Sequence, residues 1–146
     1  MEELTVIYQL ILSGFFGGAI GFVRERDKKA AGLRTHMLVC IGSTLFMMVS
    51  IGMSQKFPGS DAGRIAAQVV TGIGFIGAGA ILQSGKAIRG LTTATSVWVT
   101  AAIGLAVGCG LYIGAASATL LTLLVIEGLR KIEQVYFKQK DDQQEG

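Results

Sequence analysis

The sequence predicts an all-α, polytopic membrane protein with five transmembrane helices. Its longest run without a charged residue, Gly90–Ile126, has 37 residues, whereas one membrane-spanning helix needs only ~20 apolar residues. Three further charge-free runs, Leu4–Val23, Met37–Gln55 and Ile65–Gly85, are each about one span long. Charged residues make up only 16% of the chain, against roughly 25% in a soluble domain. The composition therefore predicts a single integral membrane domain.

Each predicted helix has its own justification. The first run follows Glu2 and Glu3 instead of a positively charged segment, so we expect a retained helix and not a cleaved signal peptide. The longest run can hold two helices, and Gly108–Gly110 is the natural turn between them. The predicted spans are Leu4–Val23, Met37–Met53, Ile65–Leu82, Thr92–Val107 and Leu111–Ile126. We expect the membrane domain to cover residues 1–133, followed by a short charged tail at residues 134–146.

The distribution of lysine and arginine predicts the orientation of these helices. Basic residues near span ends favour the cytoplasmic side. With five helices, 11 basic residues share one face, and the other face holds only Lys56 and Arg64. The N-terminus is then outside and the C-terminus inside, whereas a four-helix arrangement would put the basic tail outside and is rejected. The net charge of +3 follows from this bias and does not indicate binding to nucleic acid.

Small residues recur through four of the five predicted helices. In lipid, helices associate through small side chains that let two backbones approach closely. The recurrence predicts a tightly packed bundle in which glycines lie at the helix contacts. The expected packing glycines are Gly14, Gly17, Gly18, Gly21, Gly72, Gly74, Gly77, Gly79, Gly104 and Gly108.

An internal repeat is also visible. Residues 14–19 resemble residues 74–79, and residues 32–35 resemble residues 90–93. The first two helices and the next two are then copies of one helix–basic loop–helix unit, in parallel and not inverted. Parallel repeats of this kind occur in transporters. Coincidence within a glycine-rich membrane sequence is the alternative.

Charged residues surround the loop after the first span. In one interpretation, Arg24 and Arg26 anchor to anionic lipid headgroups and Glu25 is paired locally. In the other, the two guanidinium groups hold Glu25 ionised, so that the loop recognises a partner or an ion. Arg34, Thr35 and His36 open the second helix, and we expect His36 to pack at the interface and not to act as a ligand.

Polar residues also mark the start of the third helix. Asp61, Arg64 and Gln68 follow a helical spacing. We expect Ser60 or Asp61 to cap the helix and Arg64 to pair with Asp61. Gln68 lies one turn deeper and should face protein, because an unpaired amide in hydrocarbon is costly.

A second polar group lies at the start of the fourth helix and consists of Thr92, Thr93, Thr95 and Ser96. Two of them can cap the helix, and the others are expected to bond to backbone carbonyls or across helices. Arg89 precedes them as a basic flanking residue. The complete set of candidate functional residues is Arg24, Glu25, Arg26, Arg34, Thr35, His36, Asp61, Arg64, Gln68, Arg89, Thr92 and Thr93.

The sequence places no acidic residue in the middle of a span. Dehydrated cation paths and proton-coupled carriers usually contain intramembrane carboxylates, but Mg²⁺ keeps several waters and needs only one or two. Glu25 and Asp61 are the candidate metal ligands, and they lie on opposite faces of the predicted membrane. No catalytic triad or phosphate-binding loop is present, so we expect no enzyme activity. No cofactor is required, and Mg²⁺ is a possible ligand.

Several of these motifs together resemble the MgtC/SapB family. The similar stretches are Arg24–Arg26, Ala31–His36, Asp61–Gly79, Arg89–Ala94 and Ala101–Gly108. The resemblance implies a bacterial inner-membrane protein linked to magnesium limitation and, in pathogens, to survival inside host cells. Many members carry a soluble C-terminal domain resembling an ACT module, whose function we expect to be absent here or supplied in trans.

The resemblance leaves two functional hypotheses. In the first, the protein is a regulatory membrane module that binds another membrane complex through its glycine-rich faces; one member of the family is thought to act on the F-type ATP synthase. In the second, it is a small magnesium transporter that works as an oligomer. The expected partners are thus membrane lipids, further copies of the chain and, under the first hypothesis, such a complex. The lack of charge within the spans favours the first hypothesis.

Overall fold

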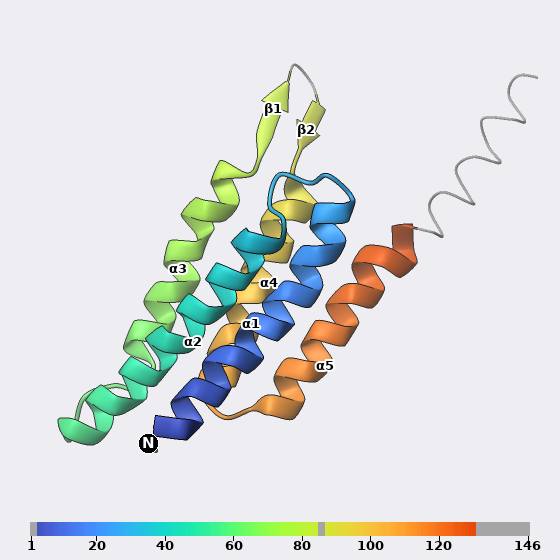
Figure 1. Cartoon of the computed structure of the whole chain (residues 1–146). Helices are drawn as coiled ribbons and strands as arrows, with labels where there is room; N and C mark the ends of the chain where they lie inside the picture. The colour runs from blue at the N-terminus through green and yellow to red at the C-terminus, as the bar shows by residue number, and fades with distance from the viewer. Residues whose placement is uncertain (1–2, 85–86, 131–146) are drawn as a thin grey trace, which may run out of the picture.

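The structure, a computed structural model, describes residues 3–84 and 87–130. It is a bundle of five helices with a short hairpin between the third and the fourth (Figure 1). The elements are α1 (Glu3–Arg26), α2 (Leu33–Lys56), α3 (Arg64–Gly79), β1 (Leu82–Ser84), β2 (Ala87–Arg89), α4 (Leu91–Gly108), α5 (Tyr112–Leu123) and the π-helical turn η1 (Leu124–Gly128). The predicted tail, Lys86 and the boundary at residue 133 lie outside the described residues.

The all-α class is confirmed, since each of the five predicted segments forms a helix. Helices α1, α2 and α4 are long and apolar enough to cross a membrane by length and composition, whereas α3 and the segment Tyr112–Gly128 are apolar but shorter. Five membrane crossings therefore stay a prediction, as do the repeat and the direction of the termini.

The predicted end of the third helix is wrong. The third helix ends at Gly79 and not at Leu82, which instead opens a hairpin in which Leu82 pairs with Arg89. Glycine has low helix propensity, so the glycine-rich end of α3 is a weak place to continue a helix. The second helix begins at Leu33, one turn before the predicted span Met37–Met53, which agrees with the expectation that Arg34, Thr35 and His36 open it. A change from charged to apolar sequence marks the edge of a membrane, but it does not end a helix.

Helix α4 is the centre of the bundle, because it contacts α1, α2, α3 and α5. One buried cluster contains Ile20, Cys40, Ile103 and Val107, which come from α1, α2 and α4. A second cluster forms where α3 meets α4 and includes Ile73. The interior of the bundle thus depends on three central helices, with α3 and α5 packed outside them (Figure 1).

Glycines bring α1, α2 and α4 into backbone contact. A Cβ atom at Gly17 would lie 2.6 Å from the His36 carbonyl oxygen. One at Gly21 would lie 2.7 Å from the Leu33 Cα, and one at Gly108 would lie 2.7 Å from the Thr44 carbonyl oxygen. Gly104 is equally close to the α2 backbone. A side chain at any of these positions would therefore push two helices apart.

The other expected packing glycines are less crowded. A Cβ at Gly14 would approach Ile41 at 3.3 Å, while Gly18 and Gly77 have only ordinary contacts, with Met37 and Ala94 respectively. No neighbouring atom within the described chain lies within 4 Å of a Cβ placed at Gly72, Gly74 or Gly79. Gly72 and Gly79 thus lie on one open side of α3, whereas Gly74 points about 200° around the helix from Gly72.

Candidate functional site

The α1–α2 loop, the β1–β2 hairpin and the end of α5 gather at one end of the bundle, opposite the N-terminus (Figure 1). This is the end predicted to be cytoplasmic. Arg24 lies here in the last turn of α1, yet only 3% of its surface is exposed. Its Nη2 donates a hydrogen bond of 2.5 Å to the Thr93 hydroxyl in the first turn of α4. Arg24 therefore points into the protein and not into the lipid headgroups.

His36 is fully buried beside this contact. Its Nδ1 lies 2.8 Å from the Gly32 carbonyl oxygen, so that nitrogen must donate. Its Nε2 lies 3.1 Å from the Ser96 hydroxyl oxygen, which also lies 2.8 Å from the Thr93 carbonyl oxygen, so the single Ser96 proton serves one of these two contacts at a time. We call Arg24, His36, Thr93 and Ser96 the inner cluster. The inner cluster links α1, α2 and α4 through polar contacts. His36 was predicted to pack at the interface, and it is instead buried within this cluster.

Glu25 has a different role from either of those predicted. Its carboxylate accepts the backbone N–H of Leu33 at 2.9 Å, and a side chain at Gly32 would collide with the same carboxylate. Gly32, at the N-cap of α2, offers no side-chain cap of its own. A carboxylate is stabilised at a helix N-terminus, so Glu25 caps α2 from the end of α1. The expectation that Arg24 and Arg26 hold Glu25 between them is not what the structure shows.

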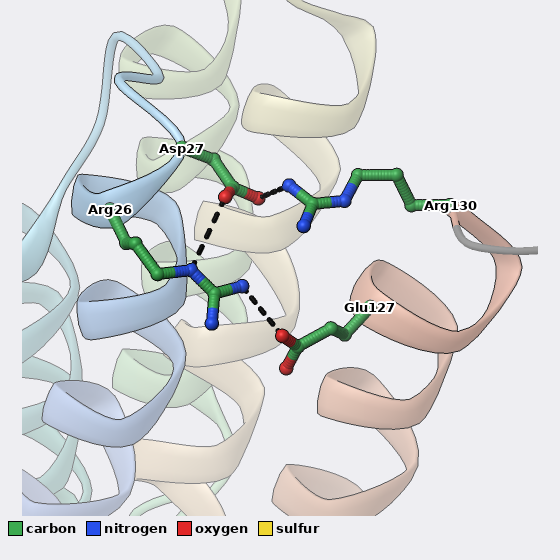
Figure 2. A network of polar contacts seen from close by, with 4 residues as sticks. All are labelled: Arg26, Asp27, Glu127 and Arg130. Carbon is green, nitrogen blue, oxygen red and sulfur yellow. Dashed lines mark hydrogen bonds and ion pairs between the residues drawn. The ribbon is translucent and has the colours of Figure 1, made fainter. Parts of the chain in front are cut away.

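A chain of four charged residues closes this end of the bundle (Figure 2). Arg26 binds Glu127 through Nη2 at 2.6 Å and approaches Asp27 through Nε at 3.4 Å. Asp27 also binds Arg130. The hydrogen bond from Arg130, together with Arg26, lowers the pKa of the Asp27 carboxyl below its ordinary value. Opposite charges thus connect the end of α1 to the end of the last helix.

Sequence reasoning overlooked Asp27 and Glu127 as polar partners at this end of the bundle. A usable signal existed, because Asp27 and Glu127 are acidic residues within basic segments that were both assigned to one face. Gln9 was also overlooked, although it is the one amide in the first apolar run. Its buried side chain donates to the Val107 carbonyl and to the Tyr112 hydroxyl, both at 3.0 Å.

The outer polar residues are not joined to the inner cluster, because the α2–α3 loop lies at the other end of the bundle (Figure 1). The Asp61 carboxylate accepts the Gly63 N–H at 2.7 Å, within its own turn. The N-cap of α3 is Gly63, without a side-chain cap, so the predicted cap by Ser60 or Asp61 is wrong. Among the described residues no ion pair joins Asp61 to Arg64, since the turn already occupies the carboxylate.

The remaining candidates lie around these two groups. Arg34, Arg89 and Thr92 are exposed at the end that holds the inner cluster, and Thr35 is half-buried. Glu25, in the last turn of α1, and Asp61, in the loop between α2 and α3, are the proposed metal ligands, and these two segments lie at opposite ends of the bundle (Figure 1). Across residues 3–84 and 87–130, no three His, Cys, Asp or Glu side chains are grouped so as to hold a metal ion.

A groove runs between α2 and α3 on the open side of α3. Its volume is about 470 Å³, and its lining is almost wholly apolar. Gln68 lies on its wall and is exposed, as are Gly72 and Phe75 of the same helix. The expectation that Gln68 faces protein is therefore not met within one copy of the chain.

Comparisons with known proteins, by family model and by individual relatives, point to the same family. The sequence model of the MgtC family matches residues 10–135. YhiD of Escherichia coli K12, provisionally named a magnesium transporter, is 52% identical over 126 residues, covering 83% of this chain and 59% of YhiD. Protein SrpB of Synechococcus elongatus is 38% identical over 145 residues, covering 92% of this chain and 80% of SrpB.

Protein MgtC of Salmonella typhimurium is 39% identical over 143 residues, covering 92% of this chain and 60% of MgtC. The chain thus spans about three fifths of the length of YhiD and of MgtC. No solved structure matches it.

Proposed function

The chain belongs to the MgtC family, and on that basis we propose that it is an inner-membrane protein of bacterial magnesium homeostasis that acts as a regulatory module. In this proposal it binds another membrane protein through the α2–α3 groove. The F-type ATP synthase stays the candidate partner that the family resemblance implies. The link to magnesium rests on YhiD, which is provisionally named a magnesium transporter.

One observation carries the docking proposal, namely the open face of α3. A Cβ atom placed on Gly72 would have no neighbour within 4 Å in the described chain. Gly72 lines the groove together with exposed Gln68, which lies one helical turn before it. In lipid, small residues allow a second helix to approach closely, and an amide gains by bonding across to it. The face therefore suits a helix from another membrane protein.

The interior argues against an ion path through a single copy. In α1 to α5, the acidic residues Glu3 and Glu25 lie in the first and last turns of α1. Buried hydroxyls are already engaged with backbone carbonyls, as with Thr44 to Gly104 at 2.7 Å and Thr100 to Ser96 at 2.8 Å. Glycine contacts bring α2 and α4 together at the centre. A partly hydrated divalent ion would find neither charge nor space along this axis.

The alternative is a magnesium transporter that works as an oligomer, and the provisional name of YhiD favours it. In that case the open face of α3 would meet a second copy, and the path would run between copies. Both functions use the same face, so growth in low magnesium alone does not separate them. A measurement of magnesium flux across the membrane distinguishes the transporter from the regulatory module.

The test combines growth and flux. Gly72→Leu fills the groove, and its Cβ atom meets no neighbour within 4 Å in the described chain, so we expect it to fold. Gly52→Leu is the matched control, because Gly52 also has open space around it and does not line the groove. We expect Gly72→Leu, but not Gly52→Leu, to lose support of growth in low magnesium. Purified protein in liposomes should show no magnesium flux above empty vesicles. Saturable flux would establish the transporter instead.

A further inference from the structure

A cavity of about 550 Å³ opens at the end of the bundle that holds the inner cluster. It lies between the end of α1, the first turn of α4 and the end of the last helix. The side chains that matter for its chemistry are Arg24, Asp27, Lys29, Thr92, Thr93 and Arg130. We call it the basic cavity. Neither the regulatory proposal nor the transporter alternative uses it.

The charge of the basic cavity is positive. Three cationic side chains, Arg24, Lys29 and Arg130, line it against one carboxylate, Asp27. That carboxylate is already bound by Arg130 and approached by Arg26 (Figure 2). The nearby Glu25 is turned toward the N-terminus of α2. The cations thus exceed the anions, and an anionic ligand would balance them.

Arg24 supplies a buried donor without a partner. Its surface is only 3% exposed, and its Nη2 is bonded to Thr93. Its Nε is buried and has no hydrogen-bond partner within the described chain, and the same is true of the Nε of Arg130, which also lines the cavity. Buried polar groups in proteins normally have a hydrogen-bond partner, so an unpaired N–H on a buried guanidinium indicates a position where an acceptor can bind. An arginine has five N–H donors and can bind an anion with several of them.

The first turn of α4 faces the same space. Its N-cap is Gly90, in the left-handed region at a φ of 92°, and among the described residues no side-chain cap hydrogen bond is present there. The first N–H groups of a helix have no partner inside it. The Gly90 carbonyl accepts its hydrogen bond from the backbone N–H of Ala94, at 2.9 Å. A helix N-terminus with free N–H groups favours phosphate-type anions, and the Thr92 and Thr93 hydroxyls lie beside it.

We propose that the basic cavity is a binding site for a phosphoryl group. The buried guanidinium of Arg24, the N-terminus of α4 and Lys29 provide donors on three sides of one volume. Phosphate oxygens match both the fork of arginine and the N–H groups of a helix start. The group can belong to the headgroup of an anionic phospholipid or to free phosphate, and both have the same recognition chemistry.

The experiment uses the purified full chain in detergent and measures its unfolding midpoint. In one arm inorganic phosphate is added against chloride at equal ionic strength, and in the other short-chain phosphatidylglycerol is added against short-chain phosphatidylcholine. Lys29→Gln removes a cavity charge. Lys28→Gln is its matched control, since Lys28 is the preceding basic residue and does not line the cavity. Arg24→Gln is a second variant that removes the buried donor.

We expect the wild type and Lys28→Gln to be stabilised in at least one arm. In Lys29→Gln the apparent affinity should fall roughly tenfold, as expected for one lost charge-assisted hydrogen bond. Response to phosphate identifies the free ion, and response to phosphatidylglycerol alone identifies the lipid. No response in either arm, or equal responses from Lys28→Gln and Lys29→Gln, would overturn the proposal. The lysine pair decides the matter even if Arg24→Gln does not fold.

Discussion

Arg24 and Thr93 are 69 positions apart in the sequence, and the guanidinium of the first donates to the hydroxyl of the second inside the protein. The contact joins the last turn of α1 to the first turn of α4. It also buries a positive charge at this end of the bundle, next to the buried His36 of α2. The consequences of this arrangement can be tested one residue at a time.

Thr93→Val should destabilise the protein by about 1–3 kcal/mol, because it leaves a buried guanidinium donor without its acceptor. Valine has nearly the same shape as threonine, so packing is preserved. Thr92→Val is the matched control, since Thr92 is the neighbouring threonine and is exposed. Thermal unfolding in detergent measures both. Equal midpoints for the two variants would mean that the Arg24 contact adds nothing to stability.

Gly17→Ala should destabilise the protein by about 1–3 kcal/mol through overpacking. The added methyl group would lie 2.6 Å from a backbone oxygen of α2, which cannot move aside cheaply. Gly77→Ala is the comparison, because its methyl group would meet Ala94 at an ordinary 3.6 Å. Both changes gain the same helix propensity, so their difference isolates the contact. If Gly17→Ala unfolds no more easily than Gly77→Ala, α1 and α2 are not in backbone contact.

Glu25→Ala should cost about 0.5–2 kcal/mol, the range for losing a helix cap. Glu25→Gln keeps an oxygen that can accept the Leu33 N–H, and it should recover most of that loss. Helix content and unfolding midpoints in detergent measure the effect. A large loss in the glutamine variant as well would show that the negative charge, and not the hydrogen bond, is what α2 requires.

The sequence was a good guide to features that depend on local pattern. Charge-free runs located all five helices, and the small-residue spacing pointed to Gly17, Gly104 and Gly108, which do lie at tight contacts. The same pattern also pointed to Gly72 and Gly74, which have open space in the described chain. Spacing shows where a helix can be approached, but not which neighbour approaches it.

The roles of the charged residues could not be read in the same way. Arg24, Glu25 and Arg26 are consecutive, yet they bind α4, α2 and the end of the last helix respectively. Successive side chains on a helix point about 100° apart, since an α-helix has 3.6 residues in each turn. Their partners depend on which helices lie in those directions, and that is a property of the tertiary fold.

The Asp27 carboxylate predicts a dependence of stability on pH. Its pKa is lowered in the folded protein by Arg130 and Arg26 from an ordinary 3.8. The unfolded chain therefore takes up the proton first as the pH falls. The contribution of Asp27 is complete above about pH 5, about one unit above the ordinary pKa, and is lost as the pH drops through the lowered folded pKa. The difference in unfolding midpoint between the wild type and Asp27→Asn should be constant above about pH 5. It should shrink as the pH is lowered further through the range in which carboxyl groups titrate.

The native cysteines allow the number of membrane crossings to be tested. Cys109 is exposed at the turn between α4 and α5, while Cys40 is fully buried and should stay silent. Partial burial raises the pKa of the Cys109 thiol, so labelling is compared with the rate after permeabilisation. Lys29→Cys places a second thiol in the exposed α1–α2 loop, at the opposite end of the bundle from that turn (Figure 1).

Three helices, α2, α3 and α4, separate these two positions. If all three cross the membrane, the two thiols lie on opposite sides. An impermeant maleimide added outside intact cells should then label Cys109 and leave Lys29→Cys unlabelled until the cells are permeabilised, because the basic loop is predicted to be inside. Labelling of both from outside would mean that the short helix α3 does not cross, since an even number of crossings returns the chain to the same side. Labelling of Lys29→Cys alone from outside would mean that all three helices cross the membrane but that the orientation is the reverse of the predicted one.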